Sequence, residues 1–488
     1  MSVRVRYAPS PTGLQHIGGV RTALFNYFFA RSQGGKFILR IEDTDRERFH
    51  EDALVDLYQT LQWLGVEYDE GPEKDGGYGP YIQSERVAMH RQYAQKLIEQ
   101  GDAYYCYCSA QRLEDLRKEQ QSKKGDIGYD RHCRDLTEEQ RKEYEAQGTQ
   151  PVVRFKVPSE GKTSFQDVLL GEVKRKNKDI PVDPVILKSD GYPTYHLANV
   201  IDDHFMEITH ILRAQEWIPS GALHVLLYKA FGWDVPTYCH LPMVMGPDGQ
   251  KLSKRHGSTS VKEFRDQGYL PEAVMNYISL LGWAYDDSRE FFTKDELEQL
   301  FSLEKLNKAP AVFDYKKLAW FNGQYIRQRS EEDLRKLVLP YLREAGLVSD
   351  PVTQSEEKVL DGAVPLIRER LKTLQDAPEL TRFLFQGVGD YDPQLLIPKK
   401  KDADTAVTVL KAADELLKGF EDREDDENEQ LFRDKAQELE VKLGDVLLPL
   451  RVAMTGSKVS PPLFESIRLI GAEETSRRIQ IAIGKLLS

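Results

Sequence analysis

The stretch Tyr7-Ala8-Pro9-Ser10-Pro11-Thr12-Gly13-Leu14-Gln15-His16-Ile17-Gly18-Gly19 decides how the N-terminal part of this chain folds. Residues 3–6 before it alternate like a strand, and the residues after it have apolar side chains at helical spacing. The helical pattern stops at Gly34, and the apolar run at residues 37–41 predicts a second, buried strand. The sequence therefore predicts a strand–turn–helix–strand unit whose first turn lies at the carboxyl end of a parallel sheet.

Three residues of this turn suit the binding of a phosphate group. A turn of this kind presents the N-terminus of a helix, where free N–H groups favour negative charge. Gly18 and Gly19 place no side chain where a nucleotide would lie, and His16 can donate a hydrogen bond to a phosphate oxygen. The alternative interpretation is a tight turn that contains a histidine by chance, because short motifs also occur without function.

A second motif lies far along the chain, at Lys251-Leu252-Ser253-Lys254-Arg255-His256-Gly257. It follows a strand-like run at residues 242–245 and a turn at residues 246–249. Two lysines three residues apart, beside an arginine and a glycine, make a cationic loop that suits a triphosphate. Taken alone, the motif is a weak signal, because clusters of lysine and arginine usually belong to a solvated surface.

Taken together and in this order, the two motifs resemble the HIGH and KMSKS signatures of class I aminoacyl-tRNA synthetases. Gly19 stands where many class I members have a second histidine, and Leu252 and Arg255 replace the usual methionine and final serine. The loop stays basic despite these departures. The resemblance runs almost from end to end and is specific to bacterial glutamyl-tRNA synthetases at residues 6–19, 40–45, 192–199 and 211–217.

This resemblance implies an α/β fold: a Rossmann-type parallel-sheet catalytic domain with an inserted α+β domain, followed by all-helical anticodon-binding domains. Helical periodicity after residue 330 agrees with it, and a charged helix is expected near residues 113–124. The expected domains are residues 1–84 and 193–250 (the two halves of the catalytic domain), 85–192 (the insertion that binds the tRNA acceptor end), 251–330 (the stem-contact domain with the lysine loop), and 331–390 and 391–488 (the two parts of the anticodon-binding domain).

Composition sets outer limits on function. The 488 residues are 40% hydrophobic and 30% charged, and no apolar run is long enough to span a bilayer. The N-terminus enters a strand directly without a signal-peptide pattern, and four cysteines are too few for a disulfide framework, so a cytoplasmic protein is expected. A net charge of −12 argues against a nonspecific polyanion binder, although local basic faces can still bind RNA.

The resemblance also implies a reaction. Enzymes of this family join glutamate to the α-phosphate of ATP, release pyrophosphate, and transfer the glutamyl group to the terminal ribose of tRNA. No protein nucleophile is needed, so positioning and charge stabilisation supply the acceleration. Magnesium would accompany ATP, held largely by phosphate and water. By resemblance, the catalytic residues are His16, Lys251 and Lys254, and the ATP-binding residues are His16, Gly18, Gly19, Glu216, Val244, Lys251, Ser253, Lys254 and Arg255.

The side-chain carboxylate of glutamate is recognised best by a planar arginine, which separates a carboxylate from an amide. The resemblance assigns this task to Arg213 and Arg6, and it assigns the substrate ammonium to Glu42. The full implied glutamate site is Arg6, Ala8, Ser10, Glu42, Tyr195, Asn199 and Arg213. Two structural alternatives remain: an ion pair between neighbouring strands for Arg6 and Glu42, and ordinary packing and capping for Tyr195 and Asn199.

A zinc site is a further expectation for the insertion. Cys106 and Cys108 are one residue apart on a strand-like segment, which places them on the same side, and Cys133 follows in the same module. Structural zinc needs four ligands, and the alternative is three reduced cysteines in a small β-core. The arrangement resembles the Cys-x-Cys, Tyr-x-x-x-Cys zinc site of a related glutamylating enzyme, which makes Tyr129 a candidate for the fourth ligand. His132 and Asp135 are the other candidates.

Other functions stay in view. A small adenylyltransferase shares the turn and the cationic loop but needs neither the insertion nor a long helical module. A non-catalytic paralogue would have lost His16 or Lys254, and both are present. Glutaminyl-tRNA synthetases have a β-rich anticodon module, whereas this one is helical. The expected partners are L-glutamate and tRNA(Glu) without a membrane, in a monomer, and the sequence leaves open whether tRNA(Gln) is charged too.

Overall fold

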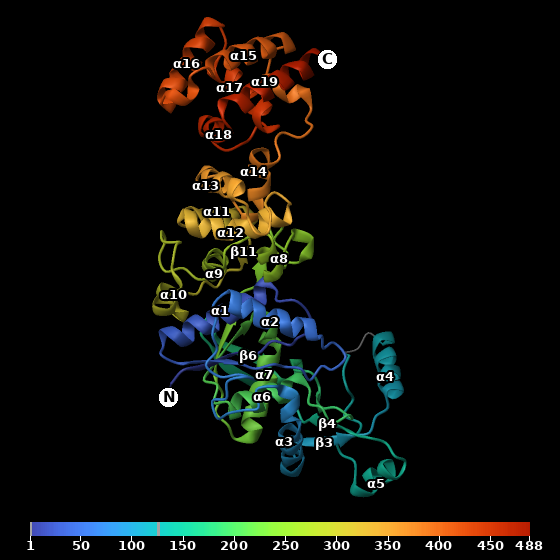
Figure 1. Cartoon of the computed structure of the whole chain (residues 1–488). Coiled ribbons are helices and arrows are strands. Elements are labelled where there is room, and N and C mark those ends of the chain that lie inside the picture. Colours follow the sequence, from blue (N-terminus) through green and yellow to red (C-terminus); the bar gives the residue numbers. More distant parts are fainter. Residues whose placement is uncertain (1, 124–126) are drawn as a thin grey trace. The chain divides into compact units, whose positions relative to one another are not determined.

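The computed structural model describes residues 2–123 and 127–488 (Figure 1). The chain forms two compact units. The first unit consists of Met1–Phe264 and Val274–Asp314, and the second of Arg265–Ala273 and Tyr315–Ser488. No helix in the described part of the chain is long and apolar enough to cross a membrane.

The strand–turn–helix–strand element predicted at the N-terminus is present. Strand β1 (Arg4–Tyr7) pairs in parallel with β2 (Lys36–Leu39), and helix α1 (Ile17–Ser32) connects them. Gly34 has a positive φ of 60°, and a Cβ on Gly35 would lie 2.3 Å from the carbonyl oxygen of Val3, so both glycines are needed for the return to the sheet. Helix α1 is buried on nearly every side rather than on one face only, because it also packs against α10 (Lys294–Leu300).

The parallel sheet continues from β1 through distant parts of the sequence. The backbone N–H of Thr209 donates to the carbonyl of Arg4 at 2.9 Å, which brings β8 (His210–Ala214) beside β1. Strand β8 pairs in parallel with β9 (Thr237–Leu241), and helices α6 (Tyr195–Phe205) and α7 (Ile218–Phe231) belong to this half of the unit. Strand β8 begins at His210, after a turn at Glu207, whose φ is 53°.

The segment between the two halves contributes to two sheets. Strands β3 (Ala103–Cys106), β4 (Val152–Phe155) and β7 (Val185–Leu187) form an antiparallel sheet. The hairpin of β5 (Lys162–Asp167) and β6 (Gly171–Lys176) instead pairs with β9, so the catalytic sheet extends into the stretch expected to be the insertion. Helices α4 (Ala110–Ser122) and α5 (Glu138–Ala146) lie between β3 and β4 in the sequence. The charged helix expected at residues 113–124 corresponds to α4, and Lys124 lies outside the described residues.

The remaining elements before the helical second unit are one short strand pair and several helices. Strand β10 (Val244–Met245) pairs in parallel with β11 (Ala311–Val312) directly before the lysine loop. The other helices up to the second unit's main body are α2 (Glu51–Trp63), α3 (Val87–Gln100), α8 (Val261–Asp266) and α9 (Pro271–Ser279).

The second unit is helical, as the periodicity after residue 330 predicts. Several of its helices start at polar caps: Ser330 accepts from the backbone N–H of Asp333 at 3.1 Å, and Thr353 forms a capping box with Glu356. One apolar core lies in the earlier helices and another in the later ones. The helices are α11 (Tyr315–Arg327), α12 (Glu331–Glu344), α13 (Gln354–Arg368), α14 (Ala377–Phe385), α15 (Ala403–Leu416), α16 (Asp425–Glu438), α17 (Leu443–Thr455), α18 (Leu463–Ile470) and α19 (Ala472–Leu487).

Candidate active site and cysteine cluster

His16 caps the helix that follows the N-terminal turn. Its Nδ1 accepts a hydrogen bond from the backbone N–H of Gly18 at 3.1 Å. A neutral imidazole that accepts through Nδ1 carries its proton on Nε2, where it can be donated to a phosphate oxygen. Burial, together with the charge of Lys251, lowers the pKa of His16, so the ring is a neutral donor near pH 7. A Cβ on Gly19 would lie 3.1 Å from the hydroxyl of Tyr7, which gives this glycine a packing role as well.

The two sequence motifs meet in the structure. The backbone N–H of Ile17 donates to Thr259 at 2.9 Å, and that of Val261 donates to Gln15 at 3.0 Å. The segment after the lysine loop is therefore bound directly to the start of α1. This contact holds the cationic loop close to the N-terminal turn.

The lysine loop is held at its base and exposed at its tip. Leu252 is buried, so a leucine fills the position of the usual methionine as an apolar anchor. The imidazole of His256 lies against Gly246, where a Cβ would come within 2.9 Å of the ring. Lys251 Nζ lies 2.7 Å from Glu216 Oε2, and Lys254 and Arg255 are exposed.

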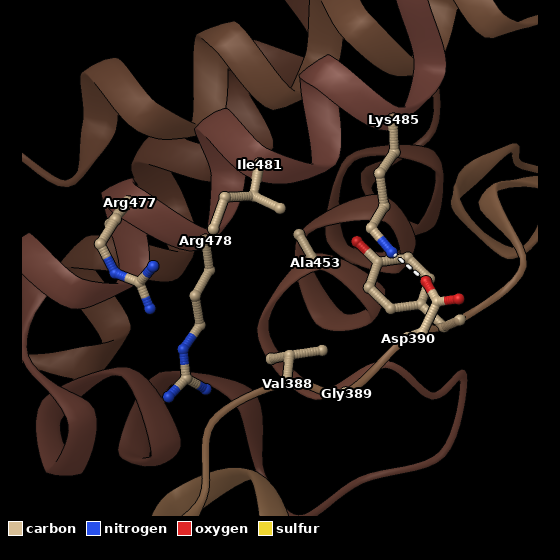
Figure 2. A pocket seen from close by; sticks show the side chains of 9 residues that line it. Val388, Gly389, Asp390, Ala453, Arg477, Arg478, Ile481 and Lys485 are labelled. Atoms are coloured by element: carbon tan, nitrogen blue, oxygen red, sulfur yellow. Dashed lines mark hydrogen bonds and ion pairs between the residues drawn. The ribbon is translucent and has the colours of Figure 1, made fainter. Parts of the chain in front are cut away.

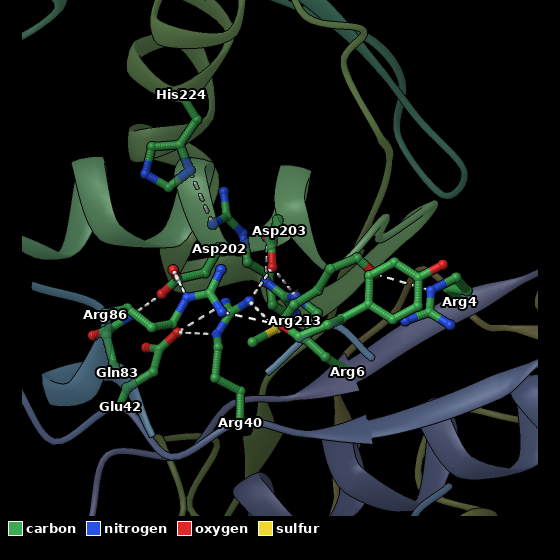
Figure 3. A network of polar contacts seen from close by, with 12 residues as sticks. Arg4, Arg6, Arg40, Glu42, Gln83, Arg86, Asp202, Asp203, Arg213 and His224 are labelled. Carbon is green, nitrogen blue, oxygen red and sulfur yellow. Dashed lines mark hydrogen bonds and ion pairs between the residues drawn. The ribbon is translucent and has the colours of Figure 1, made fainter. Parts of the chain in front are cut away.

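The arginines beneath the turn are bound to buried carboxylates (Figure 3). Arg6 donates to both oxygens of Asp203, at 3.0 and 3.2 Å, and Arg40 Nη1 lies 2.7 Å from the same carboxylate. Arg40 also binds Glu42, at 3.0 Å. Arg6 and Glu42 therefore do not pair with each other, which was one interpretation of the sequence. Each has another partner: Arg6 binds Asp203, and Glu42 binds Arg40. Burial raises the pKa of Glu42, whereas Arg40 and Arg6 oppose that shift.

Asp202 and Asp203 were not identified from the sequence, although two adjacent acids after Val200-Ile201 on an apolar helix are a detectable signal. Asp202 accepts from Arg86 at 2.6 Å, from Gln83 at 2.9 Å and from His90 at 2.9 Å. These donors outweigh burial and lower the pKa of Asp202 to about 2. Helix α6 therefore fixes several side chains of the first unit through two charged residues.

The remaining residues of the expected glutamate site lie on α6, on β8 and in the turn. Arg213 Nη1 donates to the hydroxyl of Tyr195 at 3.2 Å, so these two side chains form one wall. The Oδ1 atom of Asn199 is buried and has no hydrogen-bond partner within residues 2–123 and 127–488, which marks it as an acceptor suited to a ligand donor. Ala8 is half-buried and Ser10 is exposed.

Comparison with known proteins covers both parts of the chain. Residues 2–320 match the family model described as "tRNA synthetases class I (E and Q), catalytic domain", and residues 333–483 match "Anticodon binding domain". The glutamate–tRNA ligase of Borreliella burgdorferi is 57% identical over 482 residues, covering 99% of this chain and 98% of the relative. That of Treponema denticola is 51% identical over 504 residues, covering 99% of this chain and all of the relative.

A solved structure gives the same assignment as the sequence relatives. The crystal structure of a glutamate–tRNA synthetase from Elizabethkingia anophelis has a TM-score of 0.85 and 35% identity, covering 99% of this chain and 100% of that one. The chain belongs to the bacterial glutamate–tRNA ligase family. This class of ligase uses ATP with Mg²⁺. Membership decides against the smaller adenylyltransferases and the glutaminyl branch.

The ligase carries a compact cysteine cluster at the end of β3. The Sγ atoms of Cys106, Cys108 and Cys133 lie within 4.8 Å of one another, and Cys108 Sγ is 3.5 Å from Cys133 Sγ. Tyr129 Oη lies 3.4 Å from Cys106 Sγ and 3.7 Å from Cys108 Sγ. Hydrogen bonds from Cys108 and Cys133 lower the pKa of the Cys106 thiol, which favours a thiolate.

The other two candidates for a fourth ligand lie apart from this group. His132 and Asp135 are both exposed, whereas Cys106 and Cys133 are buried. The metal-sized group among the described residues contains neither of them. Cys239, in β9, is buried and separate from the cluster.

The C-terminal helices of the ligase contain an open pocket of about 350 Å³ (Figure 2). Arg477, Arg478 and Lys485 of α19 lie on one side and the loop at residues 388–391 on the other. Lys485 Nζ binds Asp390 at 2.6 Å. Residues 451–456 and 460–462 also meet, since Arg451 donates to the carbonyl of Pro461 at 2.9 Å.

Proposed function

We propose that the ligase activates L-glutamate with ATP at the first unit's turn and lysine loop, and then transfers the glutamyl group to tRNA(Glu). Family membership supports the ligation of glutamate to tRNA. The observation that carries the placement of the chemistry is the backbone pairing of residues 15–17 with residues 259–261. It brings a histidine donor and a cationic loop together, as a reaction without a protein nucleophile requires.

The catalytic roles are electrostatic. His16 donates from Nε2 to a phosphate oxygen of ATP, while Lys251 and Lys254 neutralise the charge that develops on the leaving pyrophosphate. Gly18 and Gly19 let the nucleotide approach α1. Further contacts to ATP come from Glu216, Val244, Ser253 and Arg255, and Mg²⁺ is held largely by phosphate and water.

The residues proposed to bind glutamate are assigned by their charge and position. Arg213 receives the side-chain carboxylate, and Tyr195 orients the guanidinium. Asn199 offers its unpaired Oδ1 to a substrate donor. The remaining contacts come from Arg6, Ala8, Ser10 and Glu42, with Glu42 on the substrate ammonium.

Pyrophosphate exchange tests this proposal. The ligase is incubated with ATP, labelled pyrophosphate and either glutamate or glutamine, with and without tRNA(Glu). Exchange with glutamate at a rate at least about a hundredfold above that with glutamine is expected, since an amide cannot accept two charged hydrogen bonds from an arginine. Equal exchange with both amino acids would contradict the proposed pocket. Charging of tRNA(Gln) transcripts at a rate similar to tRNA(Glu) would show a non-discriminating ligase.

We also infer one structural zinc per chain, bound by Cys106, Cys108, Cys133 and Tyr129. Tetrahedral zinc with Zn–S bonds of about 2.3 Å places its sulfurs about 3.8 Å apart. The 3.5 Å separation of Cys108 Sγ from Cys133 Sγ fits that spacing. Such an ion would join β3 to the segment after α4, and so shape the region proposed to bind the tRNA acceptor end.

Metal analysis of protein purified without chelator tests the zinc proposal. About one zinc per chain is expected, and a Cys106→Ser, Cys108→Ser double variant should lose it. Tyr129→Phe should weaken zinc retention against a chelator, whereas His132→Ala and Asp135→Ala should not. Zinc-free wild-type protein with full activity would refute the site.

The domain roles are part of the same proposal. Residues 85–192 bind the acceptor end, residues 251–330 the stem, and the helices of residues 331–390 and 391–488 the anticodon arm. Arg477 and Lys485 line the pocket of α19, and an RNA phosphate there would replace Glu474 and Asp390 as their partners. A monomer in the cytoplasm, where tRNA is charged, fits these roles.

A further inference from the structure

A polar column lies behind the guanidinium of Arg213. Its Nε donates to Nε2 of His240 at 3.1 Å, and Nδ1 of His240 lies 2.7 Å from Asp167 Oδ2. On the other side, Arg213 Nη1 lies 3.4 Å from Nδ1 of His224, whose Nε2 is 3.0 Å from Nδ1 of His196. His224 and His240 are both fully buried. Strands β5, β8 and β9 and helices α6 and α7 each contribute to this column.

The donors of Arg213 fix every proton in the column. An arginine has only N–H donors, so the ring nitrogens that face it must be lone-pair acceptors. His240 therefore carries its proton on Nδ1 and donates it to Asp167. His224 carries its proton on Nε2 and donates it to His196, which in turn is protonated on Nε2. All three rings are neutral in this arrangement.

The carboxylate of Asp167 is itself immobilised. Oδ1 accepts from the backbone N–H groups of Leu169 and Leu170, at 2.9 and 3.0 Å, and Oδ2 also accepts from the backbone N–H of His240 at 3.0 Å. The strands β5 and β9 meet here, at the pairing of Asp167 with Tyr238. A backbone-bound carboxylate therefore determines the tautomer and orientation of His240.

We propose that Asp167 and His240 are positioning residues for glutamate recognition, because they hold the Nε edge of Arg213 and leave the two Nη groups to receive the substrate carboxylate end-on. The inference rests on the proposed role of Arg213 as the side-chain reader. Nη1 donates to the hydroxyl of Tyr195 at 3.2 Å and lies 3.4 Å from His224, and Nη2 donates to the carbonyl of Trp217 at 3.3 Å. All three contacts are longer than the 3.1 Å contact of Nε. The Nη donors can exchange these partners for a carboxylate while His240 retains Nε.

Two substitutions of His240 separate positioning from packing. The amide of His240→Gln reaches the place of Nε2 and keeps an acceptor for Arg213. The amide of His240→Asn reaches only the place of Nδ1, so it keeps a donor for Asp167 and leaves Arg213 Nε without its acceptor. In pyrophosphate exchange with tRNA present, KM for glutamate should rise by about tenfold or more in His240→Asn. In His240→Gln it should rise less than about threefold, and KM for ATP should change little in both.

The control is Arg213→Lys, which reports on the proposed function rather than on the column. An unchanged KM for glutamate in Arg213→Lys would show that another residue reads the side chain. A raised KM in Arg213→Lys combined with equal KM values in the two His240 variants would overturn the positioning inference alone.

A second readout uses the wild-type protein and needs no folded variant. Long-range ¹H–¹⁵N spectra of labelled histidine distinguish the two neutral tautomers. At neutral pH His240 should be the Nδ1–H tautomer, and His224 and His196 should be Nε2–H tautomers. An Nε2–H or doubly protonated His240 would place a donor against Arg213 and would refute the proposal.

Discussion

At the scale of single residues, the first unit contains both exposed and fully buried charges. Lys254 is exposed in the loop, whereas Asp203 is fully buried between two arginines. The two side chains carry opposite charges and differ in their exposure to solvent. Substitutions should therefore affect activity in one case and stability in the other.

Lys254→Ala should lower the rate of pyrophosphate exchange by roughly a hundredfold or more, the usual scale for the loss of one preorganised charge-stabilising donor. Folding should be unchanged, because loop lysines rarely contribute to core stability. Lys308→Ala removes another exposed lysine and should exchange like the wild type. Wild-type exchange in Lys254→Ala would remove this lysine from the mechanism.

Asp203→Asn should destabilise the first unit by about 3–5 kcal/mol, because it leaves the guanidinium groups of Arg6 and Arg40 buried without their shared carboxylate. Urea unfolding followed by circular dichroism measures this loss. Asp287→Asn, at an exposed position, is the matched control and should stay within about 0.5 kcal/mol of the wild type. A loss below 1 kcal/mol in Asp203→Asn would show that the arginines find other partners.

At the scale of elements, the sequence pattern predicted structures formed by neighbouring residues. It did not predict contacts between residues that are far apart in the sequence. The β1–α1–β2 unit was predicted because its strand, turn and helix signals lie within 41 residues of sequence. The partner of Arg6 was not, since Asp203 lies 197 residues away on another element. The column of His196, His224 and His240 has no sequence signal, because each histidine stands alone until α6, α7 and β9 bring them together.

The buried histidines around Arg213 should make the free energy of unfolding depend on pH. Burial and Arg213 lower the pKa of His196 from 6.5 to about 4, and burial also lowers those of His224 and His240. Between about pH 4 and pH 6.5, His196 binds a proton in the unfolded chain but not in the folded protein. The free energy of unfolding should therefore decrease as pH falls from about 6.5 to about 4, and this contribution is fully present above 6.5.

Unfolding by urea at a series of pH values measures this slope. His196→Gln removes one titrating ring, so its free energy of unfolding should depend less steeply on pH over that range than that of the wild type. Parallel curves for the two proteins would show that His196 does not contribute to the acid sensitivity.

At the scale of the whole molecule, two units supply the parts that ligation requires. The sequence alone predicted the class of fold, the helical character of the second unit, and the membership of the family that the comparisons confirm. It did not predict that the β5–β6 hairpin joins β9, because one pairing residue, Asp167, decides that connection. That pairing also brings Asp167 to the column behind Arg213.

The most direct test of this account is the amino-acid preference of Arg213→Ala in pyrophosphate exchange with tRNA(Glu) present. KM for glutamate should rise by at least about thirtyfold, because the substrate carboxylate would be enclosed without its partner, while KM for glutamine should change little. The preference for glutamate over glutamine should fall accordingly. An unchanged ratio of kcat/KM for glutamate to that for glutamine would contradict the assignment of Arg213 as the reader of the glutamate side chain.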